Sequence, residues 1–107
     1  MQHEKFFAAL ANKVRLNCLS LLSTEGELCV CKLTEALHVP QPTVSRHLAI
    51  LRKAALVQDR REGYWVHYRI NPSLPHWARS TLRVYSKEAV NGTLKVSDKR
   101  CGGGRAT

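Results

Sequence analysis

The segment Gln41–Leu51 reads QPTVSRHLAIL, and the interpretation of the whole chain starts from it. Its apolar residues recur at intervals of four and three, the spacing of a helix with one buried face. They are Val44, Leu48 and Leu51. Pro42 is compatible with the first turn, because its missing N–H would have no intrahelical partner there. We therefore predict a helix over residues 41–54.

The N-terminal half of this helix leaves exposed the kind of polar side chains that contact DNA. They are Gln41, Thr43, Ser45, Arg46 and His47. A helix can enter the major groove, where Arg pairs with guanine, Gln pairs with adenine and hydroxyl groups reach bases or phosphates. We predict that these residues contact DNA and that residues 41–54 form a recognition helix.

Residues 30–37 form the predicted partner of the recognition helix, and residues 38–40 interrupt the chain between the two. The apolar residues on the stripe of the partner helix are Val30, Leu33 and Leu37. Upstream, helical spacing predicts helices over residues 3–11 and 12–23, with Asn12 as the N-cap of the second. A helix, a short break and a second helix form the order of a helix-turn-helix.

Two segments after the recognition helix are rich in aromatic and β-branched residues, Leu56–Arg61 and Tyr64–Ile70. Glu62-Gly63 lies between them, so the pattern predicts a β-hairpin with a two-residue turn. A basic hairpin of this kind lies on phosphates or in the minor groove, and we predict that Arg60 and Arg61 contact DNA there.

The remaining sequence completes the predicted domain. Residues 73–90 show the spacing of a final amphipathic helix. Residues 91–107, which include three consecutive glycines, are predicted to form a flexible tail. The fold class predicted for residues 1–90 is therefore mainly α with a small β-hairpin, a winged helix-turn-helix.

The charge of the chain is strongly positive and unevenly distributed. Its 107 residues contain 17 Lys and Arg against 8 Asp and Glu, for a formal net charge of +9. Residues 1–40 are balanced, with four basic and four acidic side chains, whereas residues 41–107 carry 13 basic and four acidic ones. A polyanion such as DNA is the expected partner.

Composition and motifs argue against several other classes of protein. No stretch approaches the roughly 18 apolar residues of a membrane span, and the N-terminus lacks the apolar run of a signal peptide. We therefore expect a cytoplasmic location, reduced thiols and no membrane partner. The chain shows no phosphate-binding loop, no paired catalytic carboxylates and no nucleophile with an evident base. Neither enzymatic activity nor an organic cofactor is expected.

A pair of thiols, Cys29 and Cys31, stands at the predicted start of the helix over residues 30–37. On a regular helix, residues i and i+2 lie about 200° apart, so one ion could bind both sulfurs only if the first turn unwound. In an extended segment the same two side chains point the same way. We therefore predict that ion capture unwinds this turn and shifts its packing against the recognition helix, so that DNA and the ion oppose each other.

Thiolate ligands restrict which ions the pair can bind, because they select soft or borderline ions rather than Mg²⁺ or Ca²⁺. Structural Zn²⁺ usually takes four ligands, and a second closely spaced cysteine pair is absent from the sequence. As(III) and Sb(III) are satisfied by two or three thiolates and suit the pair better. Lys32 is positioned to lower the pKa of a neighbouring thiol. Cys18 stands at an apolar position of the second helix and is expected to be a small buried residue.

Several segments resemble the ArsR/SmtB family of arsenic-responsive repressors. The recognition segment Gln41–Leu51 and the basic turn Arg60–Gly63 are similar to the DNA-binding unit of that family. Residues 8–16 resemble its N-terminal segment, and residues 27–31 resemble its metalloid-sensing branch. The resemblance covers about residues 4–88.

The resemblance implies a homodimer that binds a palindromic operator and leaves it when ligand binds, with the terminal helices forming the dimer interface. In many arsenic-sensing relatives a third cysteine stands at the position of Thr34. Because this chain departs from that pattern, Cys101 becomes the candidate third ligand, from the same subunit or from the other one. Relatives that sense Zn²⁺ use Asp and His residues on the last helix. That helix has only His76 here, and we reject the zinc site.

The sequence is compatible with three different functions. The first is a repressor that dissociates from double-stranded operator DNA when As(III) or Sb(III) binds Cys29, Cys31 and Cys101. The second is a thiol redox protein or a redox-sensing regulator that forms a Cys29–Cys31 or Cys29–Cys101 disulfide. The third is a ligand-independent DNA-binding protein with inert thiols. Titrating operator binding separately with arsenite, Zn²⁺ and peroxide discriminates among them.

Overall fold

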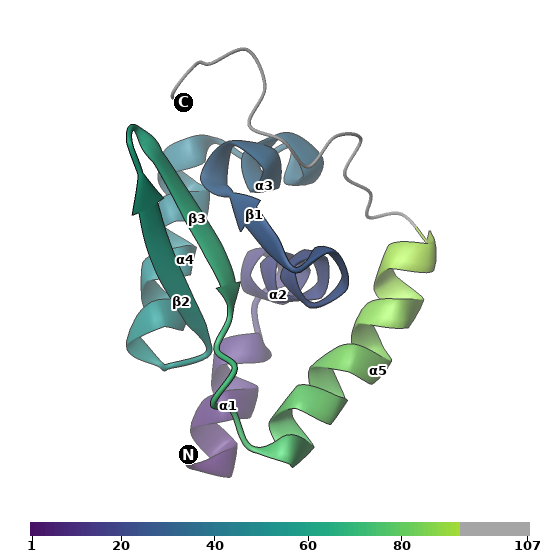
Figure 1. Cartoon of the computed structure of the whole chain (residues 1–107). Helices are drawn as coiled ribbons and strands as arrows, with labels where there is room; N and C mark the ends of the chain where they lie inside the picture. Colours follow the sequence, from purple (N-terminus) through teal and green to yellow (C-terminus); the bar gives the residue numbers. More distant parts are fainter. Residues whose placement is uncertain (93–107) are drawn as a thin grey trace.

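The structure is a computed structural model that describes residues 1–92. Its elements follow in the order α1 (His3–Leu10), α2 (Lys13–Glu25), β1 (Glu27–Cys29), α3 (Val30–Leu37), α4 (Gln41–Lys53), β2 (Val57–Glu62), β3 (Trp65–Ile70) and α5 (His76–Gly92) (Figure 1). Helices α3 and α4 with the hairpin β2–β3 form a winged helix-turn-helix, so the predicted fold class is confirmed. The predicted tail began at residue 91, but α5 continues through Gly92, and residues 93–107 lie outside the described residues.

The recognition helix α4 begins where the apolar spacing predicted. The backbone N–H groups of Thr43 and Val44 donate to the carbonyl oxygen of Pro40 at 3.0 and 3.1 Å, so this carbonyl closes the first turn without a side-chain cap. The predicted inward-facing residues are fully buried; they are Val44, Leu48 and Leu51. Arg52 and Lys53 stand in the last turn, where positive charge interacts favourably with the helix dipole.

Helix α2 begins at the predicted cap and extends slightly further than predicted. The side chain of Asn12 accepts hydrogen bonds from the backbone N–H groups of Val14 and Arg15 at 2.9 and 3.1 Å. The helix ends at Gly26, whose φ of +93° is a backbone conformation that glycine adopts without steric cost. The chain can therefore turn sharply from α2 into the next element.

Strand β1 is an element that the sequence analysis missed. It pairs antiparallel with β3, so the sheet has three strands in the order β1-β3-β2 rather than the two of the predicted hairpin. In this register Glu27 stands opposite Arg69, and Cys29 stands opposite His67. Three residues are too few to show the alternation that identifies a strand in a sequence. The strand forms because the turn after α2 brings it to the free edge of β3.

The hairpin turn lies one residue later than predicted. Glu62 pairs with Trp65, so the turn consists of Gly63-Tyr64, and the predicted turn Glu62-Gly63 was wrong. The carboxylate of Glu62 lies 3.3 Å from Nε2 of His67 on the neighbouring strand. Gly63 takes the positive φ of +62° that the turn requires.

Helix α5 begins at His76, whereas the predicted start was residue 73. The side chain of Asn71 accepts a hydrogen bond from the backbone N–H of Ser73 at 2.9 Å, which makes a turn after β3. The carbonyl oxygen of Pro75 then accepts the N–H groups of Ala78 and Arg79 and starts the helix. Local side-chain and backbone bonds therefore hold the segment between β3 and α5 outside the helix.

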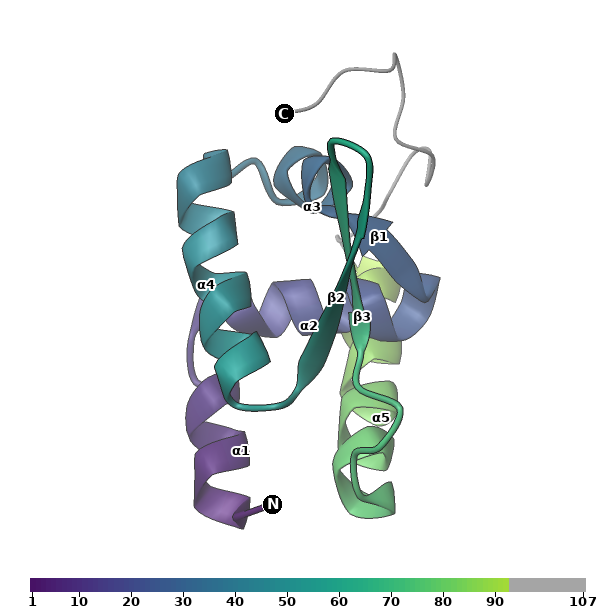
Figure 2. The ribbon, with the colours of Figure 1, turned by 60° about the vertical axis from the view of Figure 1, so that its left-hand side comes forward.

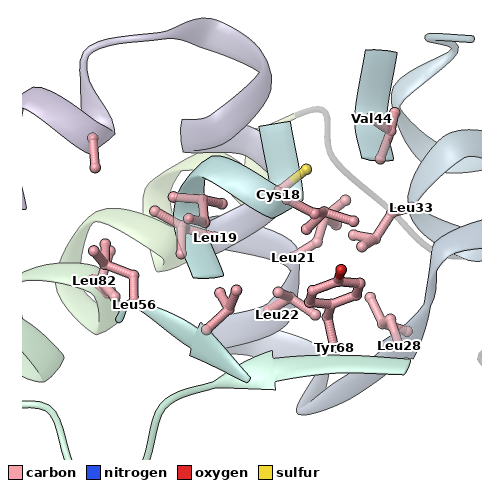
Figure 3. Packing of buried hydrophobic residues seen from close by; sticks show 14 of the residues in the cluster. Cys18, Leu19, Leu21, Leu22, Leu28, Leu33, Val44, Leu56, Tyr68 and Leu82 are labelled. Atoms are coloured by element: carbon pink, nitrogen blue, oxygen red, sulfur yellow. The ribbon is translucent and has the colours of Figure 1, made fainter. Parts of the chain in front are cut away.

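Helix α2 forms the centre of the core, and every residue of its segment Cys18–Leu22 is buried. Figure 3 shows Leu21 and Leu22 against Leu28 of β1 and Tyr68 of β3. Each buried leucine of this kind contributes about 1.5–3 kcal/mol. Burial raises the pKa of the Cys18 thiol to about 12, so the thiol stays protonated and packs as a small apolar group, as predicted.

Helix α1 and the start of α5 both lie at the end of the molecule opposite the hairpin tip (Figure 2). The ring of Phe6 in α1 packs edge-on against Trp77 in α5, with centroids 4.9 Å apart. Large apolar side chains of the same two helices stay exposed: Phe7 by 51%, Val84 by 66% and Tyr85 by 40%. In the part of the chain that the structure describes, no helix is both long and apolar enough to cross a membrane.

Candidate thiol site and nucleic-acid interface

Cys29 and Cys31 lie next to each other without any distortion of α3. Cys29 is the last residue of β1 and directly precedes α3, with extended backbone angles (φ −77°, ψ 159°). Cys31 lies in the first turn of α3, and a disulfide joins the two residues, whose Cα atoms are 5.4 Å apart. The prediction that this turn must unwind before both sulfurs can reach one ion was wrong, because it treated both residues as helical.

The thiol pair lies at the edge of the core. Cys29 has 1% of its surface exposed, whereas Cys31 is half-buried. The sequence analysis expected reduced thiols, whereas the structure shows this pair oxidised to a disulfide, because the two residues stand close enough to be joined. The predicted cation beside them, Lys32, is buried, and its Nζ lies 3.7 Å from a carboxylate oxygen of Glu35. Lys32 therefore forms an ion pair with Glu35.

Among the described residues, the possible metal ligands at this site are the two sulfurs of Cys29 and Cys31, which a disulfide joins here. Within residues 1–92, no group of three or more His, Cys, Asp or Glu side chains is arranged to hold a metal ion. His67 stands opposite Cys29 in the sheet; its buried Nε2 lies 3.3 Å from a carboxylate oxygen of Glu62 and has no hydrogen-bond partner among the described residues. The predicted third ligand, Cys101, lies outside the described residues. Two thiolates suit a trivalent metalloid better than they suit structural Zn²⁺, which usually takes four ligands.

A cavity of about 220 Å³ connects the thiol pair with the recognition helix and the wing. Residues from all three parts line it, among them Cys29, Cys31, Gln41, Ser45, Arg61 and Tyr64. Figures 1 and 2 both show the hairpin tip beside α3, as this lining requires. Two of the three predicted ion ligands and three of the predicted DNA contacts therefore line the same cavity. No sequence pattern indicated this, because the pairing of β1 with β3 creates the arrangement.

The two wing arginines point to opposite faces of the sheet, as neighbouring residues of a strand do. Arg61 lines the cavity on the side of the recognition helix. Arg60 lies on the outer face, where its guanidinium donates to both carboxylate oxygens of Glu27 at 2.6 and 3.3 Å. This hydrogen bond holds the pKa of Glu27 below its usual range. Only Arg61 is thus directed toward the predicted DNA-reading surface.

On the recognition helix, the predicted contact residues differ in exposure. Arg46 is exposed, whereas Gln41, Thr43, Ser45 and His47 are half-buried. Among the described residues, Arg46 forms no ion pair. Its guanidinium is therefore available to a base or a phosphate.

The side chain of His47 is engaged with an arginine that the sequence analysis did not single out. Nη1 of Arg15 lies 3.2 Å from Nδ1 of His47, and Nε of Arg15 donates to the carbonyl oxygen of Ala9 at 2.8 Å. Burial, followed by the charges of Arg15 and Arg46, lowers the pKa of His47 below its ordinary value. The neutral ring is therefore favoured at this position. No local pattern could have indicated the contact, because its partners lie on different helices.

Comparison with known proteins finds matches to bacterial regulators. A family model described as "Bacterial regulatory protein, arsR family" matches residues 12–59. The chain is 49% identical over 77 residues to the arsenic resistance transcriptional regulator ArsR1 of Pseudomonas putida. This match covers 72% of this chain and 60% of that protein. It is 53% identical over 78 residues to the arsenical resistance operon repressor of Escherichia coli strain K12. This match covers 73% of this chain and 67% of that protein. The chain thus spans about two thirds or less of the length of these relatives.

Solved structures match over a larger part of the chain. The antimony-specific transcriptional repressor AntR superposes with a TM-score of 0.65 at 30% identity, over 80% of this chain and 78% of that one. A homodimeric winged helix-turn-helix DNA-binding domain from Mycobacterium bovis superposes with a TM-score of 0.66 at 31% identity, over 80% of this chain and 76% of that one. Both likenesses extend well beyond the residues that the family model matches.

Proposed function

Because the chain belongs to the ArsR family of bacterial regulatory proteins, we propose that it is a transcriptional repressor controlled by trivalent metalloids. It binds double-stranded operator DNA as a homodimer in the cytoplasm and dissociates when As(III) or Sb(III) binds the thiolates of Cys29 and Cys31. The observation that carries this proposal is the cavity that both cysteines share with Gln41 and Ser45 of the recognition helix.

Capture of the inducer is a ligand exchange at the reduced thiol pair. Each thiolate replaces one hydroxide of As(OH)₃, and each thiol proton leaves with that hydroxide as water. The extended backbone of Cys29 brings the two side chains together beforehand, so little ordering is needed on binding. Burial of Cys29 limits competition from water. The pair is therefore suited to chelate one ion as a unit.

Inducer and DNA oppose each other through the shared cavity. An ion held by Cys29 and Cys31 changes what fills the space beside Gln41 and Ser45. The same ion lies where α3 begins, and α3 packs against α4. An ion that binds better to the DNA-free arrangement of these helices lowers operator affinity by the same factor by which DNA lowers affinity for the ion. Unwinding of α3 is not required.

The contacts to DNA follow from the placement of the recognition helix and the wing. We assign base or phosphate contacts to Gln41, Thr43, Ser45, Arg46 and His47 on α4 and to Arg61 on the wing. Arg46 is the strongest candidate for a base contact because it is exposed and has a forked donor group. Arg60 is assigned a weaker phosphate contact, because its guanidinium is already paired with Glu27.

The homodimer is assigned to the terminal helices. The exposed apolar side chains Phe7, Val84 and Tyr85 belong to α1 and α5, and burying them against a second copy removes this surface from water. The M. bovis structure is described as homodimeric, which supports a homodimer for this chain as well. Two recognition helices in one dimer would read two half-sites of a palindrome.

The test is an operator-binding titration on the reduced protein. A labelled duplex selected from random DNA by binding serves as the operator, and fluorescence anisotropy follows release. Arsenite, antimonite, Zn²⁺ and hydrogen peroxide are added separately. Release by arsenite or antimonite, with none by Zn²⁺, is the expected result. If the protein binds the duplex and neither arsenite nor antimonite releases it, the proposal is contradicted.

A redox-sensing regulator is a second candidate, and the disulfide between Cys29 and Cys31 is the observation that favours it. A peroxide would accept two electrons from the two thiols, which gives one disulfide and two molecules of water. Oxidation would also remove the thiolates that capture a metalloid. Release of the operator by hydrogen peroxide but by neither metalloid would establish this function in place of the first.

A further inference from the structure

The hydroxyl group of Thr34 is a buried polar group whose hydrogen-bonding capacity is unused. Among the residues that the structure describes, its Oγ1 is inaccessible to solvent and has no hydrogen-bond partner. Buried polar groups are nearly always hydrogen-bonded, so each exception calls for an explanation. A ligand that is not part of the chain is one such explanation.

Two other hydroxyls in the helices, those of Ser20 and Thr81, are satisfied within the helix itself. Ser20 donates to the carbonyl oxygen of Leu16 at 2.9 Å, and Thr81 donates to that of Trp77 at 2.7 Å. Thr34 forms no corresponding bond to the carbonyl four residues earlier. Its hydroxyl is therefore left available to a neighbouring group.

Thr34 stands beside the thiol pair. It follows Cys31 by three residues on α3, and residues at this spacing are neighbours on one face of a helix. Cys29 is joined to Cys31 at the start of α3, so the free hydroxyl of Thr34 lies one helical turn beyond the two sulfurs. Within residues 1–92, no further His, Cys, Asp or Glu completes a three-ligand site here.

A site with two thiolates leaves one oxygen on arsenic. When As(OH)₃ exchanges two hydroxides for thiolates, two molecules of water leave and a species (RS)₂As–OH remains. The remaining As–OH is a polar group in a largely buried place, and it needs a hydrogen-bond partner. Methylarsonous acid, CH₃As(OH)₂, loses both hydroxides in the same exchange and retains a methyl group, which needs none.

We propose that Thr34 is a specificity-determining residue that hydrogen-bonds the hydroxide retained by bound As(III). This inference rests on the proposed function, since it takes Cys29 and Cys31 as the ligands. Thr34 thereby favours inorganic As(III) over trivalent arsenicals in which a carbon substituent replaces the third oxygen. The buried hydroxyl has no partner within the described residues because its hydrogen-bond partner is the hydroxide on bound As(III).

The experiment compares Thr34→Val with Thr34→Ser and wild type, because valine has a similar shape without the hydroxyl and serine keeps it. Operator release is titrated with arsenite and, separately, with methylarsonous acid. Thr34→Val should raise the half-release concentration of arsenite about fivefold, the worth of one hydrogen bond, and leave that of methylarsonous acid unchanged. Thr34→Ser should behave as wild type does. Thermal unfolding of Thr34→Val should show no loss of stability, because no hydrogen bond within the chain is broken.

Arsenic X-ray absorption on the loaded full-length protein supplies a readout independent of DNA. Two sulfurs and one oxygen around arsenic are expected in wild type. Three sulfurs and no oxygen would overturn the role of Thr34 and favour Cys101 as a ligand. Equal shifts for both arsenicals in Thr34→Val, or no shift for either, would also overturn it while leaving the thiol site intact. Failure of wild type to respond to either arsenical would instead overturn the proposed function, and the role of Thr34 with it.

Discussion

Arg15 of α2 places Nη1 3.2 Å from Nδ1 of His47 on the recognition helix, while its Nε donates to the carbonyl oxygen of Ala9 at the end of α1. One guanidinium thus links a terminal helix, which we assign to the dimer interface, to the helix that we assign to DNA reading. A change in the packing of α1 can therefore reach α4 through a single side chain.

Acidification should weaken the fold through His47. Burial and the neighbouring guanidinium groups of Arg15 and Arg46 lower its pKa in the folded state, so the unfolded chain binds a proton at higher pH than the folded one does. The stabilising contribution of the neutral ring is present above the ordinary histidine pKa of about 6.5 and is lost as pH falls through the folded-state value. Melting temperatures measured from about pH 8 to about pH 5.5 should therefore fall more steeply for wild type than for His47→Gln. Parallel curves for the two proteins would rule out this role of His47.

Serine substitutions should separate the three described cysteines by function. Cys29→Ser and Cys31→Ser should each bind operator within about twofold of wild type and lose release by arsenite, because a single remaining thiolate cannot chelate the ion. Cys18→Ser is the matched control, since its thiol is buried and protonated. That variant should keep arsenite release and lose about 1–3 kcal/mol of stability, because it buries a hydroxyl in an apolar core. Arsenite release that survives in both Cys29→Ser and Cys31→Ser would show that the inducer binds elsewhere.

The contribution of Cys101 is a separate prediction. If it supplies a third thiolate, Cys101→Ser should weaken arsenite-driven release without changing operator affinity. Counting sulfurs by arsenic X-ray absorption in this variant and in wild type decides between a two-sulfur and a three-sulfur site. An unchanged sulfur count in Cys101→Ser would remove Cys101 from the ligand set.

The two wing arginines should differ in their effect on DNA binding. Arg61→Ala should lower operator affinity. It should also reduce the slope of the logarithm of the binding constant against the logarithm of the salt concentration by about one, as expected for a lost phosphate contact. Arg60→Ala should cost less, because Arg60 is held by Glu27 on the outer face of the sheet. Operator titrations at several salt concentrations measure both quantities. A larger loss for Arg60→Ala than for Arg61→Ala would contradict the assignment of the two faces.

Arg46 should carry sequence discrimination. Arg46→Ala is expected to reduce affinity for the selected operator by about 1–3 kcal/mol and to relax preference at one base position. Lys53→Ala is a suitable control, because Lys53 is also exposed but stands at the far end of α4. Binding to the selected duplex and to duplexes mutated at single positions gives both values. A uniform loss across all these duplexes would make Arg46 a phosphate contact.

The helix-turn-helix could be predicted because its signals are local. The spacing of Val44, Leu48 and Leu51 reports one buried face, whatever packs against it, and the residues left over are the polar ones of the reading surface. The cap at Asn12 was likewise predicted from the residue itself, whereas α2 ends at Glu25, two residues later than predicted. Composition also predicted the hairpin, although its turn was placed one residue early.

Strand β1 and the geometry of the thiol pair could not be predicted in the same way. Three residues carry no periodicity, so Cys29 was treated as helical when it is in fact extended. That single difference changed the predicted mechanism from unwinding of α3 to capture by a pair that is already side by side. The contact of Arg15 with His47 could not be predicted either, because it joins residues on separate helices.

The sequence by itself determined the helix Gln41–Lys53, the closely spaced cysteine pair and the basic character of residues 41–107, because these depend on residue type and short-range spacing. Only the tertiary structure decided that Cys29, Cys31, Gln41, Ser45 and Arg61 line one cavity, and that Arg60 does not. Those relationships arise from the pairing of β1 with β3 and the packing of α3 against α4, which bring distant segments together and leave no mark in local sequence.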